Sequence, residues 1–172
     1  GIGHLSSKYP VWMSDIGTLT EAYSMMQQLG VILDRQAHAN EIVNEVKEQF
    51  ELLVPMKTLS KTLYLIWNDP IMAVGQQTFI NAMLESAGFI NVIREERYPE
   101  LSIEKLKLLD PEVILLSSEP FPFKEKHVKQ FQKFCPNAKI KIVDGELFSW
   151  YGSRLKHTPI YINSLFSELC FS

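Results

Sequence analysis

Three strand-like segments that are rich in apolar residues, separated by helical patterns, most constrain what this chain can fold into. The segments are TLYLIWN at residues 62–68, EVILLSS at 112–118 and KIKIVD at 139–144. Apolar residues on both faces of a strand are typical of a sheet that helices cover on both sides. Helical spacing predicts helices over residues 77–88, 102–110, 123–134 and 159–169, and a further short strand is predicted at 91–93. The alternation predicts an α/β fold with a mostly parallel sheet flanked by helices.

Residues 18 to about 53 carry a helical pattern. Thr18 and Glu21 are spaced as a capping box, in which each side chain accepts a hydrogen bond from the other residue's backbone N–H. The first helix is predicted to end at Gly30, and Asp34 is placed to cap a second helix that extends to about Leu53. A helix of that length spans about 27 Å, close to the width of a small domain.

The opening of the chain predicts a strand without a sheet of its own. YPVWMSD, residues 9–15, has the composition of a short strand that ends in polar residues. The chain begins without Met and soon enters this strand-like sequence. We therefore expect a fragment whose upstream part is missing.

The composition fits one soluble domain and makes nucleic acid an unexpected partner. The 172 residues are 46% hydrophobic and 22% charged, with a formal net charge of −3, so the chain offers no broad basic face. No apolar run is long enough to cross a membrane, and no signal-peptide pattern opens the sequence. The motifs CxxC, HExxH, GxxxxGKS/T and GxSxG are absent, and four scattered histidines, His4, His38, His127 and His157, argue against a metal site.

The two cysteines, Cys135 and Cys170, lie far apart in the sequence. They could pair outside the cytosol, where disulfides persist. Because only two are present and no framework spacing links them, we expect two separate thiols that are buried or partly buried.

Three predicted loops leave the carboxyl ends of the strands, where a parallel sheet binds its ligands. They are WNDPIMAVGQQ, SSEPFPF and GELFSWYGSR. In the first loop, Trp67, Asn68, Asp69 and Pro70 are candidates for a ligand-facing rim, and an ordinary strand-to-helix turn is the alternative. In the second, the stretch from Glu119 to Phe123 carries two phenylalanines, which favours a packed aromatic lid over a ligand contact.

The third loop carries the strongest binding signal. Trp150 and Tyr151 offer flat contact area at a low entropic cost. Arg154 can bind a carboxylate, a phosphate or an amide oxygen. We favour ligand binding for these three residues; the alternative is a structural lobe in which the aromatics belong to the core.

Catalytic groups are not readable in the sequence, so no enzyme is expected. Ser149 and Ser153 have no neighbouring histidine, and nucleophilic catalysis needs a base within reach. The alternative from another class is a small α/β enzyme with Asp144 or Asp69 as acid or base. A strand-end aspartate commonly caps the following turn instead. REER, residues 94–97, is interpreted as a solvated charged turn.

Several stretches, in order, resemble one known family. They are VWMSDIGTLTEAYSMMQQLG, LYLIWNDPIMAVGQQTFINAMLESAGFINV, YPELSIEKLKLLDPEVILLSS and VDGELFSWYGSRL. Together they are similar to the helical-backbone periplasmic substrate-binding proteins of ABC importers, which deliver cobalamin, ferric siderophores or haem. The similarity covers most of the chain, from about residue 9 to 170.

This resemblance implies one Rossmann-like lobe of a two-lobed binding protein, with the ligand in the cleft between the lobes. It divides the chain into residues 1–16, the last strand region of a missing N-terminal lobe; residues 17–60, the inter-lobe backbone helices; and residues 61–172, the C-terminal lobe. Position by position, it implies cleft contacts from Trp67 to Pro70 and in the stretch that runs from Phe148 to Arg154. Glu104 matches a glutamate that docks on permease arginines, with simple helix stabilisation as the alternative.

The resemblance also implies partners, a location and a ligand. The partners are the ABC importer permease, the missing N-terminal lobe and a small molecule, and the location is periplasmic or otherwise extracytoplasmic, with or without a lipid anchor. SWYGSR is most similar to the cobalamin-binding branch, and aromatics with one arginine suit a large, weakly charged corrinoid. Ferric siderophores and haem are alternatives, and haem would need an axial ligand such as Tyr151 or Tyr98. No covalently bound cofactor and no resident metal are expected.

Overall fold

The structure, a computed structural model, describes residues 2–54 and 60–170 and confirms the α/β class. One sheet has the strand order β2–β1–β4–β5, with β3 also paired to β1. The strands are β1 (Lys61–Asn68), β2 (Ile71–Ala73), β3 (Ile90–Asn91), β4 (Val113–Ser117) and β5 (Lys139–Val143). β2 is antiparallel to β1, whereas β3, β4 and β5 continue the sheet in parallel. The three long apolar runs therefore form adjacent parallel strands, as predicted.

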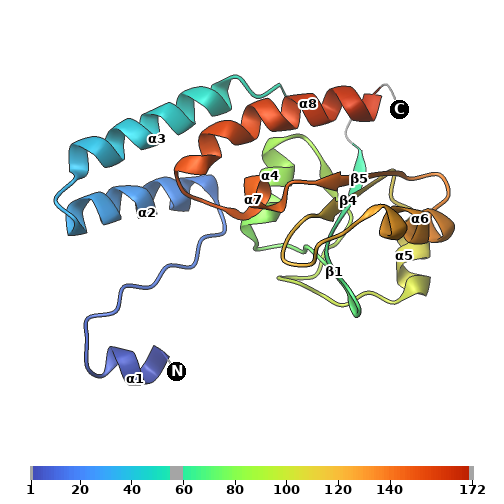
Figure 1. Cartoon of the computed structure of the whole chain (residues 1–172), viewed down its shortest axis with the longest axis horizontal. Helices are drawn as coiled ribbons and strands as arrows, with labels where there is room; N and C mark the ends of the chain where they lie inside the picture. The colour runs from blue at the N-terminus through green and yellow to red at the C-terminus, as the bar shows by residue number, and fades with distance from the viewer. Residues whose placement is uncertain (1, 55–59, 171–172) are drawn as a thin grey trace.

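Helices cover both faces of the sheet (Figure 1). One face packs against α5 (Ile103–Leu109) and α6 (Glu125–Phe134), and the other against α4 (Phe79–Ser86), α7 (Gly145–Ser149), the 3-10 helix η1 (Ser153–His157) and α8 (Thr158–Cys170). Side chains alternate along β1. Leu63 and Leu65 join the core on the face covered by α5 and α6, and Tyr64 joins the core on the face covered by α4 and α8. All three are fully buried, and each such leucine contributes about 1.5–3 kcal/mol of transfer free energy.

The helices before the sheet, α2 (Leu19–Ile32) and α3 (Gln36–Glu51), form a hairpin. The predicted capping box is confirmed: the Thr18 hydroxyl accepts from Glu21 N–H at 3.2 Å, and the Glu21 carboxylate accepts from Thr18 N–H at 3.0 Å. The prediction that Gly30 ends α2 is wrong, because the helix continues to Ile32. A Cβ at Gly30 would lie 2.5 Å from the Cβ of Ala39, so glycine here permits close packing of the two helices.

The predicted cap of α3 is also wrong. Asp34 has φ 53°, and the N-cap position is Arg35, whose side chain makes no capping hydrogen bond. A residue in the left-handed region turns the chain back between two helices and lacks the extended backbone that an N-cap requires. The helix ends at Glu51, two residues before the predicted end.

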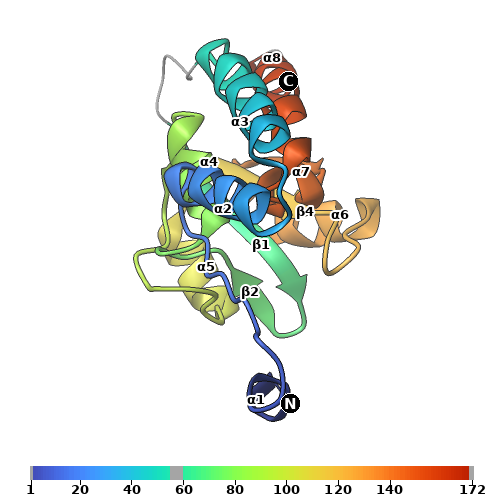
Figure 2. The ribbon, with the colours of Figure 1, turned by 90° about the vertical axis from the view of Figure 1, so that its left-hand side faces the viewer.

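The N-terminal residues form no strand. After α1 (Ile2–Ser6), residues 10–17 run as an extended segment with no ladder partner in the described part of the chain. Figure 2 shows this segment leading from the isolated α1 to the start of α2. The prediction of a strand over residues 9–15 is therefore wrong, because a strand exists only where a neighbour accepts its backbone hydrogen bonds.

No helix within residues 2–54 and 60–170 is long and apolar enough to cross a membrane.

The segment after β1 is not the strand-to-helix turn that the sequence left open as the alternative to a ligand-facing rim. It returns at once as β2, with Asn68 paired to Ile71 and Trp67 to Met72. The candidate rim from Trp67 to Pro70 is thus the tip of a β-hairpin. Three residues are too short for a periodicity signal, which explains why β2 was not predicted.

Candidate functional site

Two adjoining cavities lie at the carboxyl edge of the sheet. The smaller has a volume of about 160 Å³, and the larger about 340 Å³. Both are lined by Ile80, Tyr98 and Ser149, so the two cavities form one candidate site. This is the edge at which a parallel sheet places its ligands.

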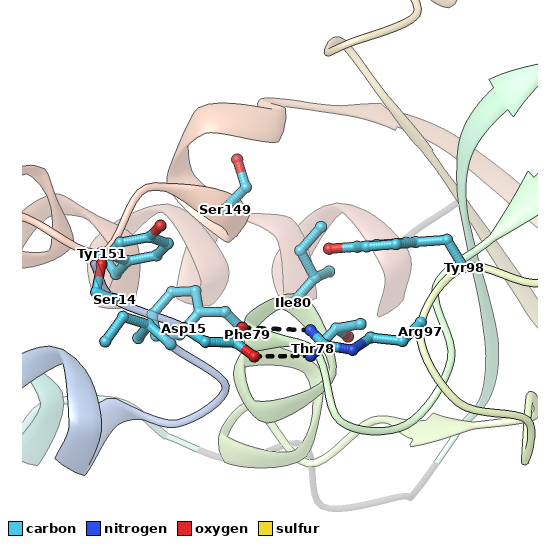
Figure 3. Close-up of a pocket in the computed structure, with 10 residues that line it drawn as sticks. Ser14, Asp15, Thr78, Phe79, Ile80, Arg97, Tyr98, Ser149 and Tyr151 are labelled. Atoms are coloured by element: carbon cyan, nitrogen blue, oxygen red, sulfur yellow. Dashed lines mark hydrogen bonds and ion pairs between the residues drawn. The ribbon is translucent and has the colours of Figure 1, made fainter. Parts of the chain in front are cut away.

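The smaller cavity gathers residues from four separate segments (Figure 3). Its lining is Ser14, Asp15, Ile16, Thr78, Phe79, Ile80, Arg97, Tyr98, Ser149 and Tyr151. Tyr98 and Tyr151 lie on opposite sides of it, with the Tyr98 ring directed across toward the loop that follows α7. Sequence reasoning placed Tyr151 here, whereas it considered Tyr98 only as a haem ligand.

The two tyrosines are held differently. Tyr151 is half-buried, and its ring meets Phe79 edge-on at a centroid distance of 5.5 Å. Tyr98 is 41% exposed, and burial of the rest of the side chain raises the pKa of its phenol. Tyr98 therefore keeps its proton at neutral pH and can donate a hydrogen bond into the cavity.

An ion pair closes one side of the smaller cavity. The Arg97 guanidinium contacts both carboxylate oxygens of Asp15, with Nη2 to Oδ2 at 2.7 Å and Nη1 to Oδ1 at 3.3 Å. Hydrogen bonding to Arg97, followed by its charge, lowers the pKa of Asp15, and the same pair raises the pKa of Arg97. The REER turn is solvated, as predicted, but its last residue lines the site. No sequence signal links two residues this far apart.

The backbone around Gly75 positions Arg97 and Tyr98. Gly75 N–H donates to Arg97 O at 2.8 Å, and Arg97 N–H donates to Gln76 O at 2.8 Å. A Cβ at Gly75 would lie 2.1 Å from the carbonyl oxygen of Glu95. Glycine at residue 75 therefore permits the close backbone approach that holds this turn.

The hairpin tip presents an aromatic surface. Trp67 is 37% exposed, its indole N–H donates to Asp69 O at 3.0 Å, and its ring meets Phe121 edge-on at 5.5 Å. Asp69 and Pro70 are exposed. The Asn68 side-chain oxygen is buried and has no hydrogen-bond partner within the described residues.

The loop from Glu119 to Phe123 divides between packing and cavity lining. Phe123 is buried and Phe121 packs against the same core, which agrees with the predicted aromatic lid. Glu119 and Pro120 line the larger cavity. The loop therefore supplies one wall of the site from a packed aromatic base.

The stretch after β5 is a short helix, α7, followed by the loop, and its aromatics separate into core and surface. Phe148 is 0% exposed, with its ring 5.2 Å from Tyr64, so it presents no face to a ligand in this structure. Trp150 is 52% exposed. Arg154 lies over the Trp150 ring at 5.9 Å and pairs with Glu146 at 2.9 Å and Asp144 at 3.5 Å, so carboxylates already balance its charge.

The candidate catalytic groups have structural partners. Asp144 Oδ1 accepts from Glu146 N–H at 3.0 Å and Leu147 N–H at 3.4 Å, which makes it the N-cap of α7. The Ser149 hydroxyl donates to Gly145 O at 2.7 Å. Within residues 2–54 and 60–170, no group of three or more His, Cys, Asp or Glu side chains could hold a metal ion.

Two other residues lie away from the cavities. Glu104 is exposed in the first turn of α5, and hydrogen bonds from its own backbone N–H and from Ser102 lower its pKa. Cys135 is a free, buried thiol, and burial raises its pKa. A free, buried thiol at Cys135 agrees with the expectation for this residue. The side chain of Cys170 lies outside the described part of the chain.

Comparison with known proteins gives a family match and a set of related structures. The model of the family described as "Periplasmic binding protein" matches residues 4–136. A possible iron-binding (periplasmic solute-binding) protein from Staphylococcus epidermidis superposes with a TM-score of 0.78 at 20% identity, covering 99% of this chain and 70% of its own. No curated protein matches the chain.

Two further structures share the fold. The periplasmic heme-binding protein RhuT from Roseiflexus gives a TM-score of 0.74 at 17% identity, covering 90% of this chain and 64% of its own. The periplasmic vitamin B12 binding protein BtuF of Vibrio cholerae gives a TM-score of 0.69 at 15% identity, covering 99% of this chain and 70% of its own. The chain therefore spans about two thirds of the length of these proteins.

Proposed function

Because the chain belongs to the periplasmic binding protein family, we propose that it is one lobe of a solute-binding receptor of an ABC importer. The family consists of binding proteins rather than enzymes. In this proposal residues 61–172 are the C-terminal lobe, residues 17–60 are the inter-lobe helices, and residues 1–16 lead from a partner lobe. The cavities at the sheet edge are then one wall of a cleft that the partner lobe completes. The receptor acts outside the cytoplasm and delivers its ligand to a membrane permease.

The proposed ligand is cobalamin or a related corrinoid. One observation carries this choice: Arg97, which lines the smaller cavity, and Arg154, which lies over Trp150, are already paired with carboxylates, while the exposed surface is aromatic. Trp67, Tyr98 and Trp150 supply that surface. A large, weakly charged macrocycle gains contact area from aromatic rings. A highly anionic ferric siderophore would need unpaired cations, which makes it the weaker alternative within this family.

Haem is the second candidate, and Tyr98 favours it. The Tyr98 side chain is directed into the smaller cavity, and a tyrosine oxygen can serve as an axial ligand of haem iron. Tyr151 faces the same cavity from the other side. A corrinoid would use these two phenols only as hydrogen-bond donors and flat surface.

Absorption titrations distinguish the candidates. The receptor with both lobes present is titrated with cyanocobalamin, with haemin and with a ferric hydroxamate, using wild type and Tyr98→Phe. If the ligand is a corrinoid, cyanocobalamin binds and Tyr98→Phe changes its affinity only a few-fold, about one hydrogen bond. If haemin alone binds and Tyr98→Phe abolishes the charge-transfer absorption from the tyrosine oxygen to the haem iron, haem replaces a corrinoid as the proposed ligand.

Permease docking is proposed for the exposed face of α5. Glu104 remains ionised near neutral pH because its carboxylate accepts hydrogen bonds at the start of the helix. An exposed carboxylate on a fixed helix can pair with an arginine of a partner. α5 covers the sheet face opposite α4 and α8.

The enzyme alternative has no supporting observation. Asp144 caps α7, and Asp69 is exposed at the hairpin tip. Turnover of a nucleotide-like or sugar-like substrate that fails in Asp144→Asn would revive this alternative.

A further inference from the structure

A chain of aromatic contacts runs from α6 to the hairpin tip of the candidate site. The ring of His127 meets Phe121 at 5.2 Å and Phe123 at 5.5 Å, both edge-on. Phe121 in turn meets Trp67 at 5.5 Å. Phe121 also belongs to the loop whose Glu119 and Pro120 line the larger cavity. One histidine thus supports both the tryptophan of the rim and a wall of the site.

The hydrogen bond of His127 requires a neutral ring. His127 is 5% exposed, and its Nδ1 accepts from the backbone N–H of Lys124 at 2.8 Å. An accepting Nδ1 carries no proton, so the ring proton lies on Nε2. Burial and then the charge of Lys126 lower the pKa of His127. Protonation would turn Nδ1 into a second donor facing the Lys124 N–H and would bury a charge without a partner.

The lysine charges that act on the His127 ring, those of Lys126 and Lys124, oppose its protonation. Glu125 lies in the first turn of the same helix, and Glu119 lies at the start of the aromatic loop. The elements packed against α6 are α5 and β5, and their charged residues, with the cap of α5, are Glu104, Lys105, Lys107, Asp110, Lys139 and Lys141. Lys105 is paired with Glu95 and Lys141 with Glu168.

We propose that His127 is a positioning residue for the candidate site and makes it sensitive to acid. The neutral ring holds Phe121 against Trp67 and fixes the loop from Glu119 to Phe123, which lines the larger cavity. The protonated ring loses its hydrogen bond to the Lys124 N–H, so that the Phe121–Trp67 contact and the loop are no longer held in place. The consequence for ligand affinity rests on the proposed function, whereas the movement of Trp67 does not.

The first test follows Trp67 without any ligand. The chain has three tryptophans, so Trp12→Phe with Trp150→Phe leaves Trp67 as the sole tryptophan, whose emission can be excited selectively at long wavelength. We expect its emission to change between pH 8 and pH 5, with a midpoint below the ordinary histidine value of about 6.5. His127→Gln keeps a side-chain acceptor for the Lys124 N–H but does not titrate, so the transition should disappear. The exposed His157→Gln is the matched control and should retain it.

A second variant covers the case in which His127→Gln fails to fold, as judged by circular dichroism. Phe121→Leu leaves His127 in place but removes the aromatic link, so His127 should still titrate by NMR while Trp67 emission no longer follows it. An emission transition that persists in His127→Gln or in Phe121→Leu would overturn the proposal, as would a Trp67 signal that is flat across this pH range in the single-tryptophan protein with His127 intact.

The second test measures ligand affinity at pH 7.5 and pH 5.5, using cyanocobalamin and haemin as probes. We expect the affinity of the bound probe to fall about fivefold, the equivalent of one net hydrogen bond, and to stay constant in His127→Gln. An equal fall in both proteins contradicts the link between His127 and the site. If neither probe binds, the proposed function fails, and the fluorescence titration still decides the role of His127.

Discussion

Arg97 and Asp15, 82 residues apart in the sequence, form a bidentate ion pair, with Nη2 to Oδ2 at 2.7 Å and Nη1 to Oδ1 at 3.3 Å. Asp15 belongs to the extended segment before α2, and Arg97 to the turn that precedes Tyr98. The pair therefore attaches the segment that enters the helical hairpin to the edge of the sheet. It also balances a positive charge that faces the smaller cavity.

Replacing Asp15 should shift the ligand preference toward anions. In Asp15→Asn the guanidinium of Arg97 loses its carboxylate partner and becomes available to a carboxylate of the ligand. We expect the Kd of haemin, which carries two propionates, to fall about two- to fivefold while that of cyanocobalamin changes less. Calorimetry measures both, with the exposed Glu51→Gln as the charge-matched control. Equal changes for the two ligands would show that Arg97 does not contact the ligand.

Phe148 and Trp150 should separate stability from binding. Phe148→Ala removes a fully buried ring and should cost about 3–5 kcal/mol of unfolding free energy. Trp150→Ala removes a half-exposed ring and should change stability by less than about 1 kcal/mol, while weakening ligand binding. Urea denaturation and calorimetry measure the two effects. A core-sized loss of stability in Trp150→Ala, with normal binding, would make Trp150 a structural residue.

Gly75→Ala should disturb the turn that holds Arg97 and Tyr98. The new Cβ would lie 2.1 Å from the carbonyl oxygen of Glu95, and backbone must move to relieve this contact. We expect a loss of about 1–3 kcal/mol in unfolding free energy. Gly152→Ala is the matched control, because a Cβ there meets nothing within 4 Å. Equal stabilities of the two variants would refute this role of Gly75.

Glu104→Lys should impair delivery without affecting ligand capture. The exposed carboxylate on α5 would be replaced by a cation, which a permease arginine repels. Transport, or stimulation of the permease ATPase, should fall while the Kd of the ligand is unchanged. Glu48→Lys, the same charge change on the exposed side of α3, should leave transport intact. Normal transport in Glu104→Lys would remove the docking proposal.

The strands and capped helices were predictable because their signals are local. Apolar runs identified β1, β4 and β5, and the pair of Thr18 and Glu21 marked the start of α2. The turn at Asp34 was not predictable, because its left-handed backbone depends on how α2 packs against α3. The strand at residues 9–15 failed because strand formation depends on a neighbour that sequence composition does not report.

The candidate site was predictable in location but not in membership. Strand polarity alone placed the segments after β1, β4 and β5 at one edge. Whether Phe148 or Trp150 points inward depends on α7, a helix of five residues that is too short to show a period. The pairing of Arg97 with Asp15 depends on tertiary structure, so the REER turn carried no sign of its role.

Calorimetric titration of the receptor, with both lobes present, tests the central proposal most directly. Cyanocobalamin is titrated into wild type and into the double variant Trp67→Ala, Trp150→Ala, with unfolding measured alongside. We expect saturable binding to wild type and at least about tenfold weaker binding to the double variant, since two exposed aromatic contacts are lost. The absence of binding to wild type by cyanocobalamin, haemin and ferric hydroxamate alike would contradict the proposed receptor.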